Sequence, residues 1–445
     1  MNQPFDLLIK GATIVNHTGT FVADVAARDG KTVAIGSLGE AEAAEVIDAK
    51  GLHLLPGVID SQVHFREPGN THKEDLESGS RAAVLGGVTA VFEMPNTSPL
   101  TTTADAIQDK VDRATNRMWC DFGFYVGATA ENADQMHILE QTPGCCGVKI
   151  FMGASTGDLL VADDETLLKV MQHGRRRIAV HAEDEYRMNE REPLRHEGGV
   201  YSHPVWRDEE TAIRATNRIL RIAREAGRRV HVLHVTTSEE MAILAQNKDI
   251  ASVETTPQHI TLTAPDAYDR IGTLAQMNPP IRDSRHQPGI WEAIINGTVD
   301  VIGSDHAPHT WEEKSKDYPF TPSGMPGVQT LLPVLLTHAN NGKLSLERVV
   351  DLTSHGVNRI FNLRDKGRLT VGFDADYTLV DLKKEWTITH DWSASKCGWT
   401  PFDGFKAIGM PVGTIIRGNK VMFEGELAEK AGGQPIRFQE TIEGQ

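Results

Sequence analysis

Short apolar runs alternate with amphipathic helical patterns through the middle of the chain, from about residue 54 to residue 363. Each run is long enough for one buried strand, and the stretches between most of the runs are long enough for a helix. Residues 211–225 illustrate the helical pattern, because Ile213, Ile219, Leu220 and Ile222 fall on one side of a basic face. The predicted strands are Gly57–Phe65, Val88–Met94, Phe122–Gly127, Val148–Met152, Arg177–His181, Val230–His234, Ser252–Thr255 and Val299–Gly303.

This alternation predicts an α/β fold, a (β/α)8 TIM-like barrel over residues 55–363. A doubly wound sheet is the alternative, and it would place ligands in one crevice. The barrel is favoured because polar, chemistry-bearing residues follow many of the predicted strands.

The two ends of the chain have a different texture, made of short β-rich segments separated by turns. We expect them to form one small β-sandwich domain from residues 1–54 and 364–445. Its strand-like segments are Asp6–Asn16, Val22–Ala26, Thr32–Ile35, Tyr377–Leu382 and Gly413–Met422.

Composition excludes several classes of partner and location. The formal charge of −16 disfavours binding to nucleic acid or to an anionic membrane, since phosphate neutralisation needs a basic surface. No apolar stretch approaches the roughly 18 residues of a membrane span, and the N-terminus has no secretory signal pattern. The chain has 4 cysteines, too few for a disulfide framework, and Cys145 and Cys146 are adjacent. We expect a cytoplasmic protein with reduced cysteines and a small-molecule substrate.

The candidate chemistry lies where the predicted strands end. Val299–Gly303 is followed by Asp305, while other strands end at His64, His181 and His234, and Lys149 sits inside an apolar run. A single histidine at a strand end is more often a hydrogen-bonded core residue than a ligand. Several of them at corresponding tips of one barrel, with an aspartate, predict a metal site for hydrolysis.

Lys149 has two interpretations. It could be a structural partner in an ion pair. Burial, however, lowers the pKa of a lysine, and a neutral amine can add carbon dioxide to become an anionic carbamate that bridges two cations. We favour the carboxylated lysine, because no other anionic bridge is evident.

The motifs together identify a family resemblance over nearly the whole chain. The chain resembles the dihydroorotases of the amidohydrolase superfamily, in the cyclic amidohydrolase branch. The matching segments are Pro56–Asp60, His64–Gly69, Thr71–Asp75, Gly86–Thr89, Met94–Thr97, Asn278–Arg282, Ser304–His309 and Pro401–Gly404.

The resemblance implies a zinc site and a reversible reaction between N-carbamoyl-L-aspartate and L-dihydroorotate in pyrimidine biosynthesis. Asp305 would take a proton from the attacking water and pass it to the leaving nitrogen. Asn278 would bond to the ring. One zinc would be held by His181 and His234, the other by His64 and Asp305, with carboxylated Lys149 between them. The substrate carboxylate would be gripped by Arg66, Asn96 and His309.

This sequence departs from the family pattern at Gln62. The first barrel strand usually carries His-x-His, and here it reads Gln62-Val63-His64. A carboxamide oxygen is a poor zinc ligand beside an imidazole. We therefore expect one tight zinc at His181 and His234 and a weaker second ion at His64 and Asp305.

Other functions remain open at this stage. Dihydropyrimidinase, hydantoinase and allantoinase would share the metal cage, but a neutral ring gives Arg66 no charge to pair with. A non-catalytic dihydroorotase-like subunit that scaffolds aspartate carbamoyltransferase is a rival of another class, although it would not need the metal cage. The resemblance implies a homodimer and an association with aspartate carbamoyltransferase as further expectations.

Residues 311–323 follow the last predicted strand, and we expect either a lid or a static surface loop there.

Overall fold

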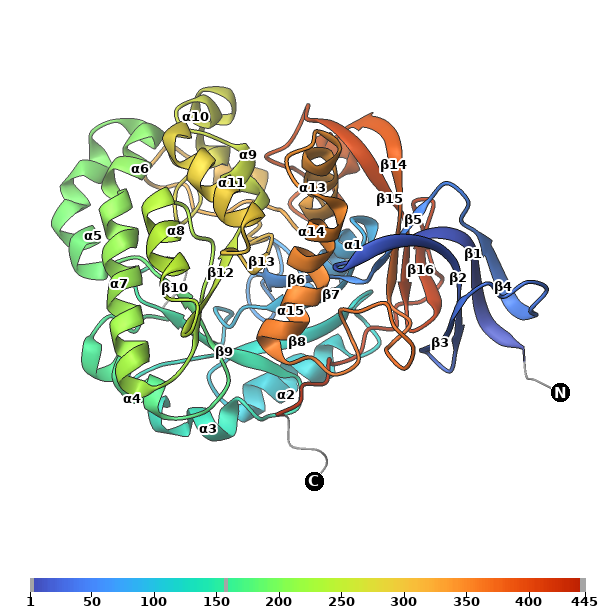
Figure 1. Cartoon of the computed structure of the whole chain (residues 1–445). Helices are drawn as coiled ribbons and strands as arrows, with labels where there is room; N and C mark the ends of the chain where they lie inside the picture. The colour runs from blue at the N-terminus through green and yellow to red at the C-terminus, as the bar shows by residue number, and fades with distance from the viewer. Residues whose placement is uncertain (1–3, 156–158, 441–445) are drawn as a thin grey trace.

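A parallel eight-stranded sheet is the centre of the molecule, and helices surround it (Figure 1). The computed structural model describes residues 4–155 and 159–440. Neighbouring strands pair in chain order and in parallel, so the predicted (β/α)8 barrel is confirmed. Its strands are β6 (Val58–Val63), β7 (Val88–Glu93), β8 (Asp121–Gly127), β9 (Cys145–Phe151), β10 (Ile178–His181), β11 (Val230–Val232), β12 (Ala251–Thr255) and β13 (Val301–Ile302).

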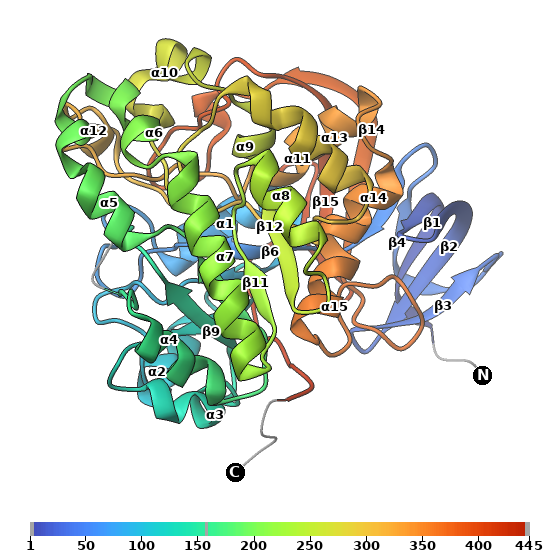
Figure 2. The same ribbon diagram turned by 60° about the vertical axis from the view of Figure 1, so that its left-hand side comes forward.

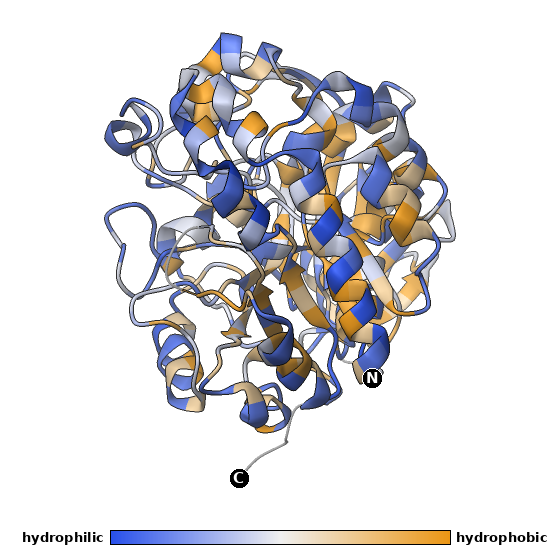
Figure 3. Ribbon diagram, turned by 90° about the vertical axis from the view of Figure 1, so that its left-hand side faces the viewer, coloured by the Kyte–Doolittle hydropathy of each residue, from blue (hydrophilic) through white to orange (hydrophobic). Residues whose placement is uncertain are grey.

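Every residue of these strands is buried, because the strands face the barrel interior on one side and the helices on the other. This explains why the strands are near-continuous apolar runs. Figure 3 shows the resulting pattern, with apolar strands inside and polar residues on the outer sides of the helices. The helices are α1 (Leu76–Leu85), α2 (Ala104–Ala114), α3 (Met136–Leu139), α4 (Asp164–Gln172), α5 (Glu185–Arg191), α6 (His203–Trp206), α7 (Glu209–Ala226), α8 (Ser238–Ala245), α9 (Pro257–Thr261), α10 (Asp266–Ile271), α11 (Gln287–Ile295), α12 (Trp311–Lys314), α13 (Leu331–Asn340), α14 (Leu346–Val350) and α15 (Gly356–Phe361).

Helix α7 shows how the local sequence sets these elements (Figure 2). The Asp208 side chain caps its first turn by accepting a hydrogen bond from the Thr211 backbone N–H. Gly227 ends it in the left-handed conformation, with φ 67°, where a residue with a Cβ is strained. The apolar side of the helix, including Ile219 and Ile222, is buried as the periodicity predicts.

The barrel closes between its first and last strands. Val63, at the end of β6, forms a parallel bridge with His306, which follows β13. The His64 backbone N–H donates to the His306 carbonyl oxygen at 2.7 Å. This closure brings the residues after β6 and β13 to the same rim, at the carboxyl ends of the strands.

A second, separate nine-stranded sheet is built from both ends of the chain (Figure 1). It is mostly antiparallel, and β5 from the N-terminal part pairs with β14 from the C-terminal part. The predicted division at residues 54 and 363 stays a prediction. The strands are β1 (Phe5–Asn16), β2 (Gly19–Arg28), β3 (Lys31–Gly36), β4 (Ala43–Asp48), β5 (His53–Pro56), β14 (Tyr377–Thr387), β15 (Lys406–Ile416), β16 (Asn419–Phe423) and β17 (Glu426–Leu427).

Two expectations from composition can be compared with the structure. All 4 cysteines are free and buried, as expected for packing residues. Among the helices of residues 4–155 and 159–440, none is long and apolar enough to cross a bilayer.

Candidate active site

A cavity opens at the carboxyl ends of the barrel strands, and most of the predicted site residues surround it. Its wall includes five of them, which come from five separate segments of the chain. These five are His64, His181, His234, Asn278 and Asp305. The other lining residues are Gln62, Phe151, Ser155, Ala307, Ser323 and Gly324.

His181 and His234 face each other across this cavity. His181 Nδ1 lies 3.0 Å from His234 Nε2, and His181 Nε2 lies 2.9 Å from a carboxylate oxygen of Glu183. Burial would raise the pKa of Glu183, but Arg207 and His181 outweigh it and lower that pKa to about 2. Glu183 is therefore ionised and accepts a hydrogen bond from the His181 Nε2–H, which leaves the Nδ1 lone pair of the neutral ring directed at His234. Burial lowers the pKa of both histidines, so both are neutral near pH 7.

Lys149, on β9, lies in the same buried region. Its amine is buried and has no hydrogen-bond partner among the described residues. It lies 4.4 Å from the centre of the Phe151 ring, which forms part of the cavity wall. Burial lowers the pKa of Lys149 to about 7, and Asp305 and Glu254 oppose that shift only in part. A neutral amine is thus accessible at physiological pH.

Gln62, the residue that departs from the family pattern, contacts the predicted acid. Its Nε2 donates to Asp305 Oδ1 at 2.9 Å, and His64 Nε2 lies 3.2 Å from the same oxygen. His64 Nδ1 is 2.8 Å from Asn96 Oδ1. Asn96 Oδ1 and the Asp305 carboxylate oxygen both accept hydrogen bonds, so the single proton of the neutral His64 ring can be donated to only one of them at a time. Gln62 Nε2–H donates a hydrogen bond to the carboxylate with either His64 tautomer.

The other three predicted substrate residues are not in the cavity wall: Asn96 contacts His64, and Arg66 and His309 lie next to the cavity. Period-two alternation along an extended first strand would place Gln62, His64 and Arg66 on one face, but Arg66 does not follow that alternation. Strand β6 ends at Val63, and Arg66 has φ 64°, which breaks the alternation of an extended strand. Its guanidinium instead reaches the loop after β13, where Nε donates to the Pro308 carbonyl and Nη2 lies 3.3 Å from His309 Nε2.

Two site residues at the strand ends have a left-handed backbone conformation that directs their side chains. His234 and Asp305 have φ of 37° and 45°, values that cost energy for residues other than glycine. Such strain is found at functional sites, where packing holds a side chain in an unfavourable conformation. The bends turn these side chains toward the cavity.

The donor set fits a divalent cation in part. His181 Nδ1 and His234 Nε2 lie 3.0 Å apart, and the unpartnered Lys149 amine and Asp305 lie in the same buried region. Imidazoles with one N–H held by a carboxylate are typical zinc ligands. Within the described ranges, however, no group of three or more His, Cys, Asp or Glu side chains is arranged as a metal-ligand cluster. Two imidazoles therefore form the core of the candidate metal centre.

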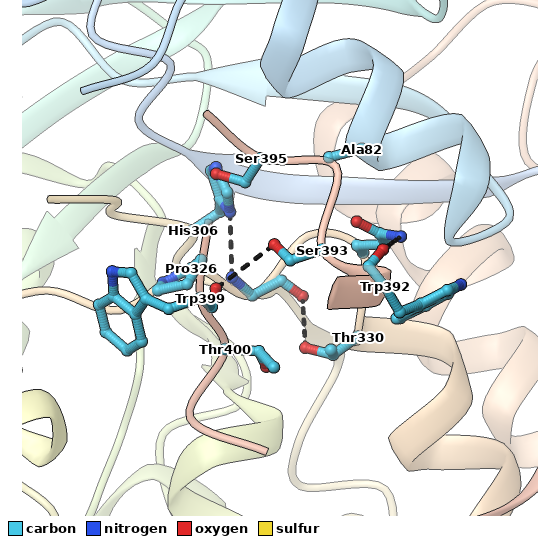
Figure 4. A pocket seen from close by; sticks show the side chains of 11 residues that line it. Ala82, His306, Pro326, Thr330, Trp392, Ser393, Ser395, Trp399 and Thr400 are labelled. Carbon is cyan, nitrogen blue, oxygen red and sulfur yellow. Dashed lines mark hydrogen bonds between the residues drawn. The ribbon is translucent and has the colours of Figure 1, made fainter. Parts of the chain in front are cut away.

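His306 and His231 take no part in the cavity. Figure 4 shows His306 beside a separate small pocket between the barrel and residues 392–400. Its Nδ1 accepts from the Gly327 backbone N–H at 3.0 Å, and its Nε2 is 3.4 Å from Glu74. His231 is buried inside the barrel against Ser252 and Glu254. Both are buried core residues.

Sequence reasoning missed several residues of this site. Glu183 lies two positions after His181, a spacing that could have been recognised as a carboxylate partner for that imidazole. Its own partner Arg207, whose Nη1 donates at 2.8 Å, comes from a distant loop and left no local signal. Ser155 and His203, both close to Asn278, were missed for the same reason.

Comparison with known proteins gives a consistent picture. A protein-family model described as "Amidohydrolase family" matches residues 53–421 of this chain. A dihydroorotase from Halobacterium salinarum is 37% identical over 387 residues, covering 86% of this chain and 89% of that protein. An allantoinase from Desulfitobacterium hafniense is 33% identical over 446 residues, covering 97% of this chain and 99% of that protein.

Solved structures agree with this relationship. An L-hydantoinase (dihydropyrimidinase) from Arthrobacter aurescens superimposes with a TM-score of 0.93 at 32% identity, covering 97% of this chain and 99% of that one. The family match spans most of the sequence, and the relatives named are hydrolases of cyclic amides. The chain therefore belongs to the amidohydrolase family, and it is an enzyme of the cyclic amide hydrolase type.

Proposed function

We propose that this enzyme is a dihydroorotase, which interconverts L-dihydroorotate and N-carbamoyl-L-aspartate in pyrimidine biosynthesis. Five of the curated relatives, at 34–37% identity, carry that name. The proposal also needs a group that recognises the carboxylate of dihydroorotate, which the uncharged rings of other cyclic amides lack.

Arg66 is that group, and its environment is the observation that carries the proposal. Arg66 is 6% exposed, and none of the described acidic residues forms an ion pair with its guanidinium. Its neighbours are the Pro308 carbonyl and His309, beside the cavity wall at Ala307 and Ser323. A buried, unpaired charge is costly unless a ligand supplies the opposite charge. An anionic substrate satisfies this requirement.

Zinc is the proposed cofactor. His181 and His234 would hold one tight ion with carboxylated Lys149, and His64 and Asp305 a weaker second one. When bound, such an ion supplies Lewis-acid chemistry by lowering the pKa of water and polarising a carbonyl. The contact between Gln62 and Asp305 supports a lower affinity for the second ion than for the first. The Gln62 amide is hydrogen-bonded to a carboxylate oxygen that a second ion would need.

The chain's own side chains bind the substrate and move the proton. Asp305 lines the cavity between Gln62 and His64, where it accepts a proton from the attacking water. It returns this proton to the ring nitrogen as the carbon–nitrogen bond breaks. Arg66, Asn96 and His309 orient the carboxylate by charge-assisted hydrogen bonds, and Asn278 holds the ring. In the biosynthetic direction the same steps run in reverse.

Turnover of dihydroorotate, dihydrouracil, hydantoin and allantoin by the purified, zinc-loaded enzyme tests the proposal. We expect dihydroorotate to have the highest kcat/KM. A preference for hydantoin or dihydrouracil would favour a hydantoinase, the second candidate, which the TM-score of 0.93 to an L-hydantoinase supports. An absence of turnover on all four rings would favour a scaffold for aspartate carbamoyltransferase. Gel filtration with and without that partner tests the proposed homodimer and the association.

A further inference from the structure

Asn278 lines the cavity through a side-chain amide that has two different ends. An asparagine amide presents an accepting oxygen at one end and two N–H donors at the other. The end that faces the cavity therefore decides which atom of a substrate can bind there. The answer depends on His203, a buried histidine of α6 that contacts Asn278 from outside the cavity.

His203 Nε2 contacts two atoms at once. It lies 2.9 Å from the Met277 backbone carbonyl oxygen and 3.0 Å from the Asn278 amide oxygen. The histidine is neutral, because burial and then Arg207 lower its pKa to about 3, so only one ring nitrogen carries a proton. A backbone carbonyl can only accept. The proton must therefore be on Nε2, which makes His203 a donor to both neighbours.

The orientation of Asn278 follows from this tautomer. If the amide were reversed, its NH2 group would face the Nε2–H of His203, and two donors would oppose each other. The oxygen thus points toward His203, and the NH2 group points the other way. Nδ2 lies 3.4 Å from Ser155 Oγ, and both residues are in the cavity wall.

We propose that His203 is a positioning residue that fixes the Asn278 amide with its N–H donors toward the cavity, so that the site selects a ring carbonyl oxygen and not a ring N–H at this point. The inference rests on the proposed function only in the choice of dihydroorotate as the substrate of the assay. It holds for any cyclic amide the enzyme hydrolyses, and it implies the same orientation of ring carbonyls in each of them.

Three variants test the proposal. His203→Phe keeps a ring but removes the donor, and we expect KM to rise about 5- to 10-fold, the effect of one hydrogen bond, with kcat changed less than about threefold. His203→Gln retains an N–H donor and should restore most of the KM. Asn278→Asp keeps an oxygen toward His203 and replaces the cavity-facing NH2 with an acceptor, so kcat/KM should fall by about 100-fold.

Controls separate positioning from folding. His338 is also buried; its side chain is hydrogen-bonded to Thr261 and packs edge-to-face against Trp291, outside the cavity. His338→Phe should leave KM unchanged. Thermal unfolding and zinc content should match the wild type for His203→Phe, and combining it with Asn278→Ala should add nothing to Asn278→Ala alone.

The ring-nitrogen NMR shifts of His203, assigned by their loss in His203→Gln, report the tautomer without any substrate. The proposal is overturned by a proton on Nδ1, by a folded His203→Phe enzyme with unchanged KM, or by wild-type kcat/KM in Asn278→Asp. If dihydroorotate is not a substrate, the proposed function fails, but the same measurements apply to the ring that is hydrolysed.

Discussion

The Glu183→Gln substitution tests how the structure holds the candidate metal centre. Glu183 is fully buried, with Arg207 Nη1 at 2.8 Å and His181 Nε2 at 2.9 Å from the same oxygen. Its pKa falls from 4.5 to about 2, and at about 1.4 kcal/mol for each pKa unit the ionised form gains about 3 kcal/mol on folding. Removing one partner of a buried ion pair independently costs about 3–5 kcal/mol. We expect the variant to lose about 3 kcal/mol of unfolding free energy at pH 7.

The pH dependence of this loss has a definite sign. The folded-state pKa of Glu183 lies below its unfolded value, so its contribution is complete above about pH 4.5 and is lost as pH falls toward 2. The stability difference between wild type and Glu183→Gln should be constant from pH 7 to about pH 5 and should shrink below that. Urea unfolding of the metal-free proteins at several pH values measures it.

The effect on zinc distinguishes this pair from an ordinary buried ion pair. Glu183→Gln should weaken zinc binding by about 10- to 100-fold, because the neutral glutamine no longer provides the ionised acceptor that holds the His181 ring. Glu140 and Arg228 form an equally buried pair next to Arg175 and Arg176, which precede β10, at the opposite end of the barrel. Glu140→Gln should cost similar stability and leave zinc affinity unchanged. Equal zinc affinity in the two variants would refute the reasoning about His181.

Three further substitutions probe other parts of the structure. Gln62→His should raise the zinc content measured by metal analysis from about one ion per chain toward two; two equally tight ions in the wild type would contradict the role of Gln62. Arg66→Ala should lower kcat/KM for dihydroorotate by about 10- to 150-fold, the loss of a charged hydrogen bond, and leave hydantoin turnover unchanged; full dihydroorotase activity would contradict the carboxylate assignment. Lys314 is buried, and burial alone lowers its pKa to about 7. Its folded-state pKa lies below the unfolded value, so wild-type stability should rise between pH 7 and about pH 10, and urea unfolding should show a smaller rise in Lys314→Met; an identical pH dependence would contradict this.

The sequence determined the barrel strands, because a strand buried on both sides needs a continuous apolar run. All eight predicted strands overlap those of the structure, with ends displaced by a few residues. The small sheet was predicted less completely. Gly413–Met422 was expected to be one strand, but Arg417 and Gly418 have positive φ and make a tight turn between β15 and β16. The strands β4, β5 and β17 were not predicted, and β5 and β17, with 4 and 2 residues, are too short to show a pattern.

The sequence also placed chemical groups at the strand ends, because a motif and its strand are local. The contacts among those groups were decided only by the tertiary structure. Gln62 meets Asp305 across 243 positions in the chain, and Arg207 reaches Glu183 from another loop. The contact between Gln62 and Asp305 depends on how the barrel closes between β6 and β13 and on the left-handed bend at Asp305. The direction of the Asn278 amide likewise depends on the single proton of His203, 75 positions away. Local periodicity determines the elements, whereas the partners of a buried charge or amide follow from three-dimensional packing.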